Sequence, residues 1–162
     1  MKKEQAPNDQ ITLDKTDIQL LKLLQQNGKW TVRELAAKVN LSATPVHDRI
    51  KRLETAGVIS HYAAIVDRSK LEQFILFYVN INLKEHSTQL GAAFISRITA
   101  FPEIVECYTI GGEHDFMIKV IVRDMAQYRR FFVEQLGEVP NIAKLQSIIV
   151  LDTIKHDISV PL

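Results

Sequence analysis

The sequence predicts an α+β protein in which an N-terminal (winged) helix-turn-helix precedes a βαββαβ ferredoxin-like domain. The first 60 residues of the 162-residue chain contain three closely spaced helix-start signatures. The remainder alternates strand and helix patterns in the order β-α-β-β-α-β, which is typical of the split βαβ fold. The change from one pattern to the other falls between Gly57 and Asp67.

The three N-terminal helices are predicted from their caps. Asp14, Thr31 and Ser42 each stand before a helical pattern, and each lies between apolar residues that staple the incoming chain. Thr31 and Glu34 have the spacing of a full capping box. The second helix is predicted over 32–39 and the third over about 43–56, with Gly57 as its stop. The turn between these two helices is very short, which is typical of a helix-turn-helix.

The third helix has two different faces. Val46, Ile50 and Leu53 fall on one face, which we expect to be buried. The opposite face is polar and is suited to a major groove. Its residues and those beside it are Thr44, His47, Asp48, Lys51, Arg52 and Thr55. The alternative is that this face is only a solvated surface of a small bundle.

The second half of the chain predicts four strands and two helices. The strands are expected over 74–84, 104–110, 116–122 and 145–155. Ser87 and Asp124 begin the helices, which end before Pro102 and Pro140. We therefore expect a flexible polar tail at 1–11, the helix-turn-helix at 12–60, a linking strand or hinge at 61–70, and the ferredoxin-like domain at 71–162.

Composition favours a globular protein of the cytoplasm without metal or cofactor. Hydrophobic residues make up 46% of the chain and charged residues 24%, and no apolar run reaches the length of a membrane span. Cys107 is the only cysteine, which excludes a disulfide framework and a thiolate metal cluster. The five histidines lack the spacing of a helical metal site, although a pairing of His114 with His156 across strands stays open.

The net charge of +1 conceals a weak asymmetry between the two halves. Residues 1–60 contain ten Lys/Arg against seven Asp/Glu, whereas residues 61–162 contain ten against twelve. A basic N-terminal half suits a polyanionic partner such as nucleic acid.

Short motifs along the chain, in this order and spacing, resemble the Lrp/AsnC family of bacterial and archaeal regulators (feast/famine proteins). The resemblance extends from Leu13 to Leu162. The N-terminal motifs are Leu13-Asp14-Lys15-Thr16-Asp17, Glu34-Leu35-Ala36, Leu41-Ser42-Ala43-Thr44-Pro45-Val46, Arg49-Ile50-Lys51-Arg52-Leu53-Glu54 and Gly57-Val58-Ile59. The C-terminal ones are Gly112-Glu113-His114-Asp115-Phe116, Asp124-Met125, Tyr128 and Ile154-Lys155.

The resemblance implies a transcriptional regulator that binds double-stranded DNA and responds to a small effector. It implies a sensor domain that forms homodimers through its sheet, and further assembly that is commonly an octamer. Effectors in the family are typically amino acids, bound between sensor domains of neighbouring dimers.

The predicted DNA contacts lie on the third helix. We expect Thr44, His47, Asp48 and Lys51 to read base edges, because these side chains have the donors and acceptors that bases present. Ser42, Arg49 and Arg52 are better placed for phosphates, which fix position without reading sequence. Two alternatives stay open: Ser42 is only a cap, and Arg49 snorkels or pairs with an acid.

The predicted effector site is the loop that contains Gly111, Gly112, His114 and Asp115. Glycine lets backbone N–H groups approach a carboxylate closely, and Asp115 has the charge to accept from an ammonium group. The same residues are also those expected of a hairpin turn.

Two other functions fit the same scaffold. Sirohaem decarboxylases resemble this family, helix-turn-helix included, but the sequence has no segment that clusters Arg and His for a tetrapyrrole. A partner subunit that has lost DNA binding is disfavoured by the intact caps and the basic third helix. We expect a regulator and not an enzyme.

Overall fold

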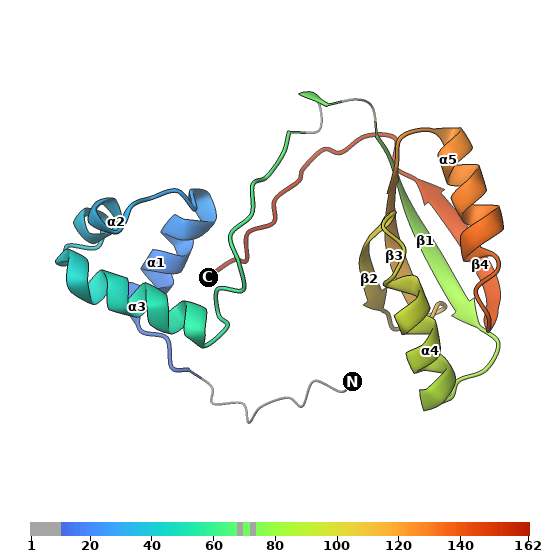
Figure 1. Cartoon of the computed structure of the whole chain (residues 1–162), viewed down its shortest axis with the longest axis horizontal. Helices are drawn as coiled ribbons and strands as arrows, with labels where there is room; N and C mark the ends of the chain where they lie inside the picture. The colour runs from blue at the N-terminus through green and yellow to red at the C-terminus, as the bar shows by residue number, and fades with distance from the viewer. Residues whose placement is uncertain (1–10, 68–69, 72–73) are drawn as a thin grey trace. The chain divides into compact units, whose positions relative to one another are not determined.

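The computed structural model describes residues 11–67, 70–71 and 74–162, and the chain packs as two units (Figure 1). The first unit comprises the residues up to Ile65 together with Asp157–Leu162. The second unit comprises Val66–His156. Each unit has a hydrophobic core of its own.

The first unit is built from three helices, α1 (Lys15–Gln26), α2 (Val32–Lys38) and α3 (Ala43–Thr55). Its buried core residues come from all three helices: Leu20, Leu35, Ala36 and Val46. Four residues, 39–42, separate α2 from α3, which confirms the predicted helix-turn-helix.

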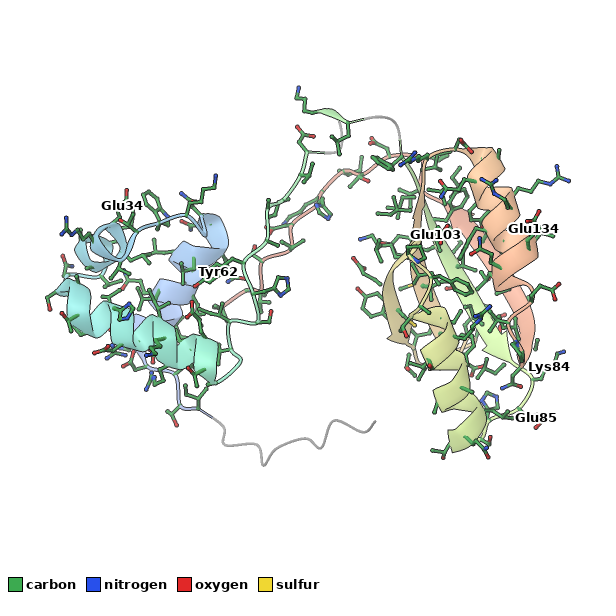
Figure 2. The ribbon with its side chains drawn as sticks, in the orientation of Figure 1. Glu34, Tyr62, Lys84, Glu85, Glu103 and Glu134 are labelled. Carbon is green, nitrogen blue, oxygen red and sulfur yellow. The ribbon has the colours of Figure 1, made fainter. Side chains whose placement is uncertain are left out.

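Capping boxes fix the beginnings of α1 and α2. Asp14 Oδ1 accepts from the Asp17 amide at 2.8 Å, and Asp17 Oδ2 accepts from the Asp14 amide at 3.0 Å. At α2, Thr31 Oγ1 accepts from the Glu34 amide at 3.3 Å, and Glu34 Oε2 accepts from the Thr31 amide at 2.7 Å (Figure 2). These reciprocal bonds satisfy amides that have no partner inside the helix.

Left-handed residues end both helices of the motif. Asn40 has a φ of 54°, and the Leu41 amide beside it donates to Ala36 O at 3.0 Å. Gly57 has a φ of 72°, and the Val58 amide donates to Leu53 O at 2.9 Å. Such a residue reverses the chain and satisfies the last carbonyls of the helix. Asn40 therefore makes the tight turn into α3, and Gly57 ends α3 as predicted.

The second unit contains one antiparallel sheet of four strands. They are β1 (Ile75–Leu83), β2 (Ile104–Thr109), β3 (Phe116–Val122) and β4 (Ile142–Ile149), in the spatial order β2-β3-β1-β4. With the two intervening helices, this order is that of the predicted ferredoxin-like fold.

Helices cover one face of this sheet. They are α4 (Thr88–Ile98) and α5 (Met125–Arg130), which continues as the π-helical turn η2 (Phe131–Leu136). The predicted caps Ser87 and Asp124 accept from the amides of Leu90 and Gln127. Phe94 and Phe131 enter the core from the helices. The strand residues of this core alternate along β1 and β3: Phe77, Val79, Ile81, Ile118 and Val120.

Two boundaries differ from the sequence prediction. Strand β4 covers 142–149 and not 145–155, because its partner β1 begins at Ile75 and leaves nothing to pair with beyond Val150. The segment expected as a linking strand or hinge at 61–70 forms no strand over 61–67, where it has no regular secondary structure, and residues 68–69 lie outside the described residues.

The C-terminal segment Asp157–Leu162 belongs to the first unit, and not to the ferredoxin-like domain that was predicted over 71–162. Gln25 of α1 binds the backbone of Val160 twice. Its Oε1 accepts from the Val160 amide at 2.6 Å, and its Nε2 donates to Val160 O at 3.1 Å. The amide side chain therefore pairs with the segment as a neighbouring strand would.

Candidate nucleic-acid interface

Helix α3 turns a polar face outward, and its apolar stripe inward. Val46 and Leu53 are fully buried and Ile50 is half-buried. The four predicted base readers, Thr44, His47, Asp48 and Lys51, are all exposed. Among the described residues, none of these four side chains has a hydrogen bond or an ion pair. Their donors and acceptors are therefore open to an external partner.

Ser42 occupies the cap position of α3, but its hydroxyl makes no cap hydrogen bond. The backbone is extended there, with φ −76° and ψ 163°, as a cap residue requires. The expected capping bond is therefore wrong for Ser42, although it is right for Asp14 and Thr31. The exposed hydroxyl stands beside the N-terminal amides of α3, where an anion is favoured.

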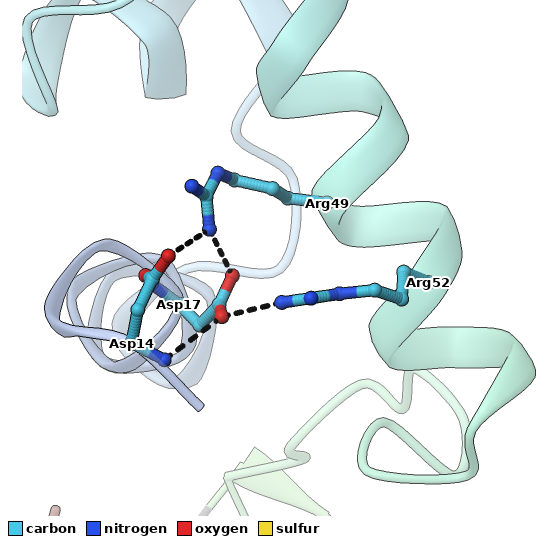
Figure 3. A network of polar contacts seen from close by, with 4 residues as sticks. All are labelled: Asp14, Asp17, Arg49 and Arg52. Atoms are coloured by element: carbon cyan, nitrogen blue, oxygen red, sulfur yellow. Dashed lines mark hydrogen bonds and ion pairs between the residues drawn. The ribbon is translucent and has the colours of Figure 1, made fainter. Parts of the chain in front are cut away.

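Arg49 and Arg52 lie on the α1 side of α3 and bind two aspartates (Figure 3). Arg49 Nη1 is 2.8 Å from Asp17 Oδ1 and 2.5 Å from Asp14 Oδ2. Arg52 Nη2 is 2.5 Å from Asp17 Oδ2. The structure thus shows Arg49 paired with acids, while about half of the Arg52 side chain stays exposed, at 47%.

These contacts change the ionisation of the network. The backbone bond from Asp17, followed by the bond from Arg49, holds the pKa of Asp14 below its ordinary value. Hydrogen bonds from Arg49 to Asp17 and then to Asp14 raise the pKa of the guanidinium. Asp14 and Arg49 are therefore both charged at neutral pH.

Asp17 ends one of the family motifs, but no role in the site was predicted for it. Its side chain is fully buried between α1 and α3. The available signal was the spacing: Asp17 follows the Asp14 cap by three residues, and Arg49 and Arg52 are also three apart, so each pair shares one helix face.

Tyr62 holds the chain that leaves α3. Its hydroxyl donates to Glu54 Oε1 at 2.9 Å, and its ring lies near Gly28, where an added Cβ would be 3.3 Å from Tyr62 Cδ1 (Figure 2). Burial and the Glu54 carboxylate raise the pKa of Tyr62 to about 12, so it remains a donor at neutral pH. This contact fixes the direction of the segment after Gly57.

The predicted effector loop connects β2 to β3 and is tied to the end of β1. Asp115 Oδ2 accepts from the Leu83 amide at 2.7 Å, and the Asp115 amide donates to Ile81 O at 3.0 Å. Asp115 Oδ1 lies 3.8 Å from Nδ1 of His86, which is mostly exposed. One carboxylate oxygen therefore supports the fold, and the other faces a histidine and solvent.

A second contact holds the same loop. The Asn82 amide donates to Glu113 O at 2.8 Å, and Asn82 Oδ1 is 2.8 Å from His114 Nδ1. Gly112 has a φ of 121°, a conformation that L side chains rarely adopt, whereas Gly111 has open space around it and no such φ. The structure thus brings His114 and Asp115 together at the β1 end, with Gly112 shaping the loop.

The face of the sheet opposite the helices carries a mixed surface. No helix packs on it in the described part of the second unit. The residues that alternate with the core residues along the strands point to this face: Leu76, Tyr78, Asn80, Met117, Lys119, Ile121, Glu106, Tyr108 and Ile148. We call this set the open face.

An ion pair lies on the open face across β2 and β3. Lys119 Nζ donates to Glu106 Oε1 at 2.7 Å, and the Tyr108 hydroxyl donates to Glu106 Oε2 at 2.6 Å. Burial opposes the ionisation of Glu106, but these donors outweigh it and hold the pKa of the carboxyl below its ordinary value. Lys119 is only 7% exposed, and its ammonium group is paired with this carboxylate, as a buried polar group requires.

Neither a metal site nor a membrane-crossing helix is found in the described ranges. No group of three or more His, Cys, Asp or Glu side chains could hold a metal ion there. No helix in those ranges is long and apolar enough to cross a membrane. Burial raises the pKa of the half-buried Cys107, so its thiol is protonated at neutral pH.

Two family models match the chain and together account for both units. Residues 13–60 match a model described as winged helix-turn-helix DNA-binding. Residues 76–160 match a model described as Lrp/AsnC ligand binding domain.

Similar proteins cover nearly the whole chain. Transcriptional regulator AzlB of Bacillus subtilis is 36% identical over 152 residues, which are 94% of this chain and 97% of that protein. The DNA-binding transcriptional activator DecR of Escherichia coli is 33% identical over 93% of this chain and 99% of its own. A crystal structure of a transcriptional regulator in complex with L-Met from Neisseria meningitidis has a TM-score of 0.87 and 32% identity, and covers 93% of this chain and 97% of that one.

Proposed function

This chain belongs to the Lrp/AsnC family of DNA-binding transcriptional regulators, and we propose which of its residues contact the DNA and the effector. The first unit carries the DNA-binding helix-turn-helix, and the second carries the ligand-binding domain. The observation that supports the DNA assignment most strongly is the exposed, unpartnered polar face of α3 behind a tight turn from α2.

In the proposed complex, α3 enters the major groove and its outward face reads the bases. Lys51 donates to guanine acceptors, Asp48 accepts from the cytosine amino group, and Thr44 bonds to a base or a phosphate. His47 flanks the same surface. Contacts of these types discriminate between bases because each base pair presents a distinct pattern of donors and acceptors in the major groove.

Phosphate contacts position the helix. We assign Ser42 and Arg52 to this role, since the Ser42 hydroxyl makes no cap bond and much of the Arg52 side chain is exposed. Arg49 was expected to join them, but two aspartates hold it and less than a third of its side chain is exposed, at 29%. We therefore propose that Arg49 mainly holds α3 against α1.

An amino acid is the proposed effector. The L-Met complex of the Neisseria regulator supports this class of ligand. In this chain Asp115 Oδ1 is a candidate acceptor for the ammonium group of the amino acid, and His86 is a candidate donor to its carboxylate. Both lie beside the loop that contains Gly111, Gly112 and His114. Effector binding changes DNA affinity only through a difference in affinity between the conformational or assembly states of the regulator.

We propose that two copies associate through the open face. A half-apolar sheet surface that includes a partly buried ion pair is a suitable self-complementary patch for a twofold dimer. A dimer would place two α3 helices in successive major grooves of a pseudo-palindromic site. Assembly of dimers into an octamer is a further expectation that follows from the family.

The relatives named above are regulators, and we propose that this chain acts as a regulator and not as an enzyme. We also propose that it acts in the cytoplasm, together with the DNA that it binds. The competing function is a sirohaem decarboxylase-like enzyme. A visible absorption band of a tetrapyrrole in the purified protein would favour that enzyme.

The test of the DNA assignment is a titration followed by fluorescence anisotropy. The probe is a duplex from upstream of the gene for this protein, with a scrambled duplex beside it and a series of salt concentrations. We expect tighter binding to the native duplex. Lys51→Ala should weaken that binding by about 1–3 kcal/mol and bring the two duplexes closer in affinity. L-Met and then the other amino acids are added to find the effector.

The matched control for Lys51→Ala is Lys155→Ala, which makes the same change of charge in the second unit. It should leave the affinity for the native duplex unchanged. Equal and weak binding of both duplexes at physiological salt, with no effect of Lys51→Ala, would refute the proposed interface.

A further inference from the structure

The buried carboxylate of Asp17 is unusual in the first unit. A carboxylate without solvent is tolerated only when it is fully paired and hydrogen-bonded. Asp17 meets this condition through three donors: Arg49 Nη1 on Oδ1, Arg52 Nη2 on Oδ2, and the backbone amide of Asp14, also on Oδ2. Only the last of these is needed to cap α1.

The two arginines differ in what they have left to donate. Arg49 uses Nη1 for both aspartates and is the more covered of the two. Arg52 binds Asp17 through Nη2 alone, and its side chain is 47% exposed. A guanidinium has five N–H donors in a rigid fork, so one edge can bind Asp17 while another remains available.

A free arginine side chain has many rotamers, and a phosphate contact requires one of them to be fixed. In this protein the ion pair to Asp17 already fixes Arg52 at the surface of α3 (Figure 3). The Arg52 side chain is therefore already ordered in the folded protein. DNA binding then causes little further loss of its conformational entropy.

From this geometry we infer that Asp17 is a positioning residue for DNA binding, which acts by holding the Arg52 guanidinium in the orientation that meets a DNA phosphate. The inference rests on the proposed role of α3 as the DNA-contacting helix. It separates Asp17 from the other acid of the network, because Asp14 contacts Arg49 and not Arg52.

The test is a double-mutant cycle in DNA affinity, measured with the native duplex at several salt concentrations. The variants are Asp17→Asn, Arg52→Gln and the double variant, each checked for folding by circular dichroism and thermal melting. We expect Asp17→Asn to weaken binding about tenfold. Arg52→Gln should weaken binding and lower the salt slope by about one. The double variant should bind no more weakly than Arg52→Gln alone.

The matched control is Asp14→Asn, which removes a carboxylate from the same network. Asp14→Asn should change the DNA affinity by the same factor in the presence of Arg52 and in the Arg52→Gln variant, because Asp14 and Arg52 do not contact each other. Arg52→Lys serves if Asp17→Asn does not fold. Lysine keeps the positive charge, so the salt slope should be unchanged. Lysine lacks the two donor edges that let arginine bind Asp17 and a phosphate together, so the affinity for the native duplex should still fall.

Two results would overturn the inference while leaving the DNA interface in place. One is an equal loss of DNA affinity from Asp17→Asn in the presence of Arg52 and in the Arg52→Gln variant, which would mean that Asp17 has a general structural role. The other is unchanged or tighter DNA binding by Asp17→Asn with a steeper salt slope, which would mean that Asp17 competes with the phosphate for the Arg52 guanidinium. If neither Arg52→Gln nor Lys51→Ala weakens binding, the interface itself fails.

Discussion

Gly111 and Gly112 are neighbours in the β2–β3 loop, but only Gly112 has a backbone conformation that requires glycine. Its φ is 121°, while Gly111 has no such φ and open space where a Cβ would be. We expect Gly112→Ala to lower the free energy of unfolding by about 1–3 kcal/mol, because alanine is strained there. Gly111→Ala should change it by less than about 0.5 kcal/mol.

Urea unfolding of the two variants at one protein concentration measures this difference. Equal effects of both substitutions would mean that the loop conformation does not depend on Gly112. If the loop also binds the effector, Gly112→Ala should weaken effector binding as well, since the contacts of Asp115 and His114 depend on the same turn.

Asp17 shows why the burial of one residue of the site could not be predicted from its own position in the sequence. A sequence pattern assigns apolar residues to the core and carboxylates to the surface, and Asp17 in the first turn of α1 is consistent with a surface position. Its burial depends on two arginines 32 and 35 residues later, and only the packing of α3 on α1 brings them together.

The N-terminal caps of the first unit differ in what they contribute to their helices. Thr31 accepts from the Glu34 amide, whereas the Ser42 side chain makes no cap bond. Thr31→Ala should therefore cost about 1 kcal/mol of stability. Ser42→Ala should cost little, but it should weaken DNA binding because the hydroxyl is the proposed phosphate contact.

Thermal melting and DNA titration of both variants separate the two roles. A loss of stability in Ser42→Ala as large as that in Thr31→Ala would show that the hydroxyl does cap α3. An unchanged DNA affinity in Ser42→Ala would remove it from the interface.

Local signals predicted the helices well and the last strand poorly. Caps, apolar periodicity and Gly57 are properties of a few consecutive residues, so the beginning of α1 and the extents of α2 and α3 follow closely from them. The end of β4 depends on where β1 begins, far away in the sequence. The apolar residues Leu151 and Ile154 suggested a longer strand, but both are 90% exposed and have no strand to pair with.

For the whole molecule, the proposed dimer is the main expectation. Ile121→Lys introduces a charge into the open face, where it would be buried without a partner on association. We expect the dissociation constant of the dimer to rise about 100-fold or more, which corresponds to about 2.7 kcal/mol. Sedimentation velocity over a range of concentrations measures it.

The control is Val133→Lys, the same kind of change on η2, at a residue that is 59% exposed on the helix side of the sheet. It should leave the monomer–dimer equilibrium unchanged. A dimer that survives Ile121→Lys but is lost in Val133→Lys would move the interface to the helices.

The pairing of Gln25 with Val160 has a practical consequence for labelling. Because Asp157–Leu162 belong to the first unit, the chain leaves that unit after Ile65, forms the second unit over Val66–His156 and returns to the first. A single protease cut within residues 61–65 would leave α1–α3 attached to the rest of the chain only through non-covalent contacts, such as those of Gln25 with Val160. A fluorophore fused after Leu162 would be attached to the DNA-binding unit, so a reporter of effector binding needs its label in a loop of the second unit.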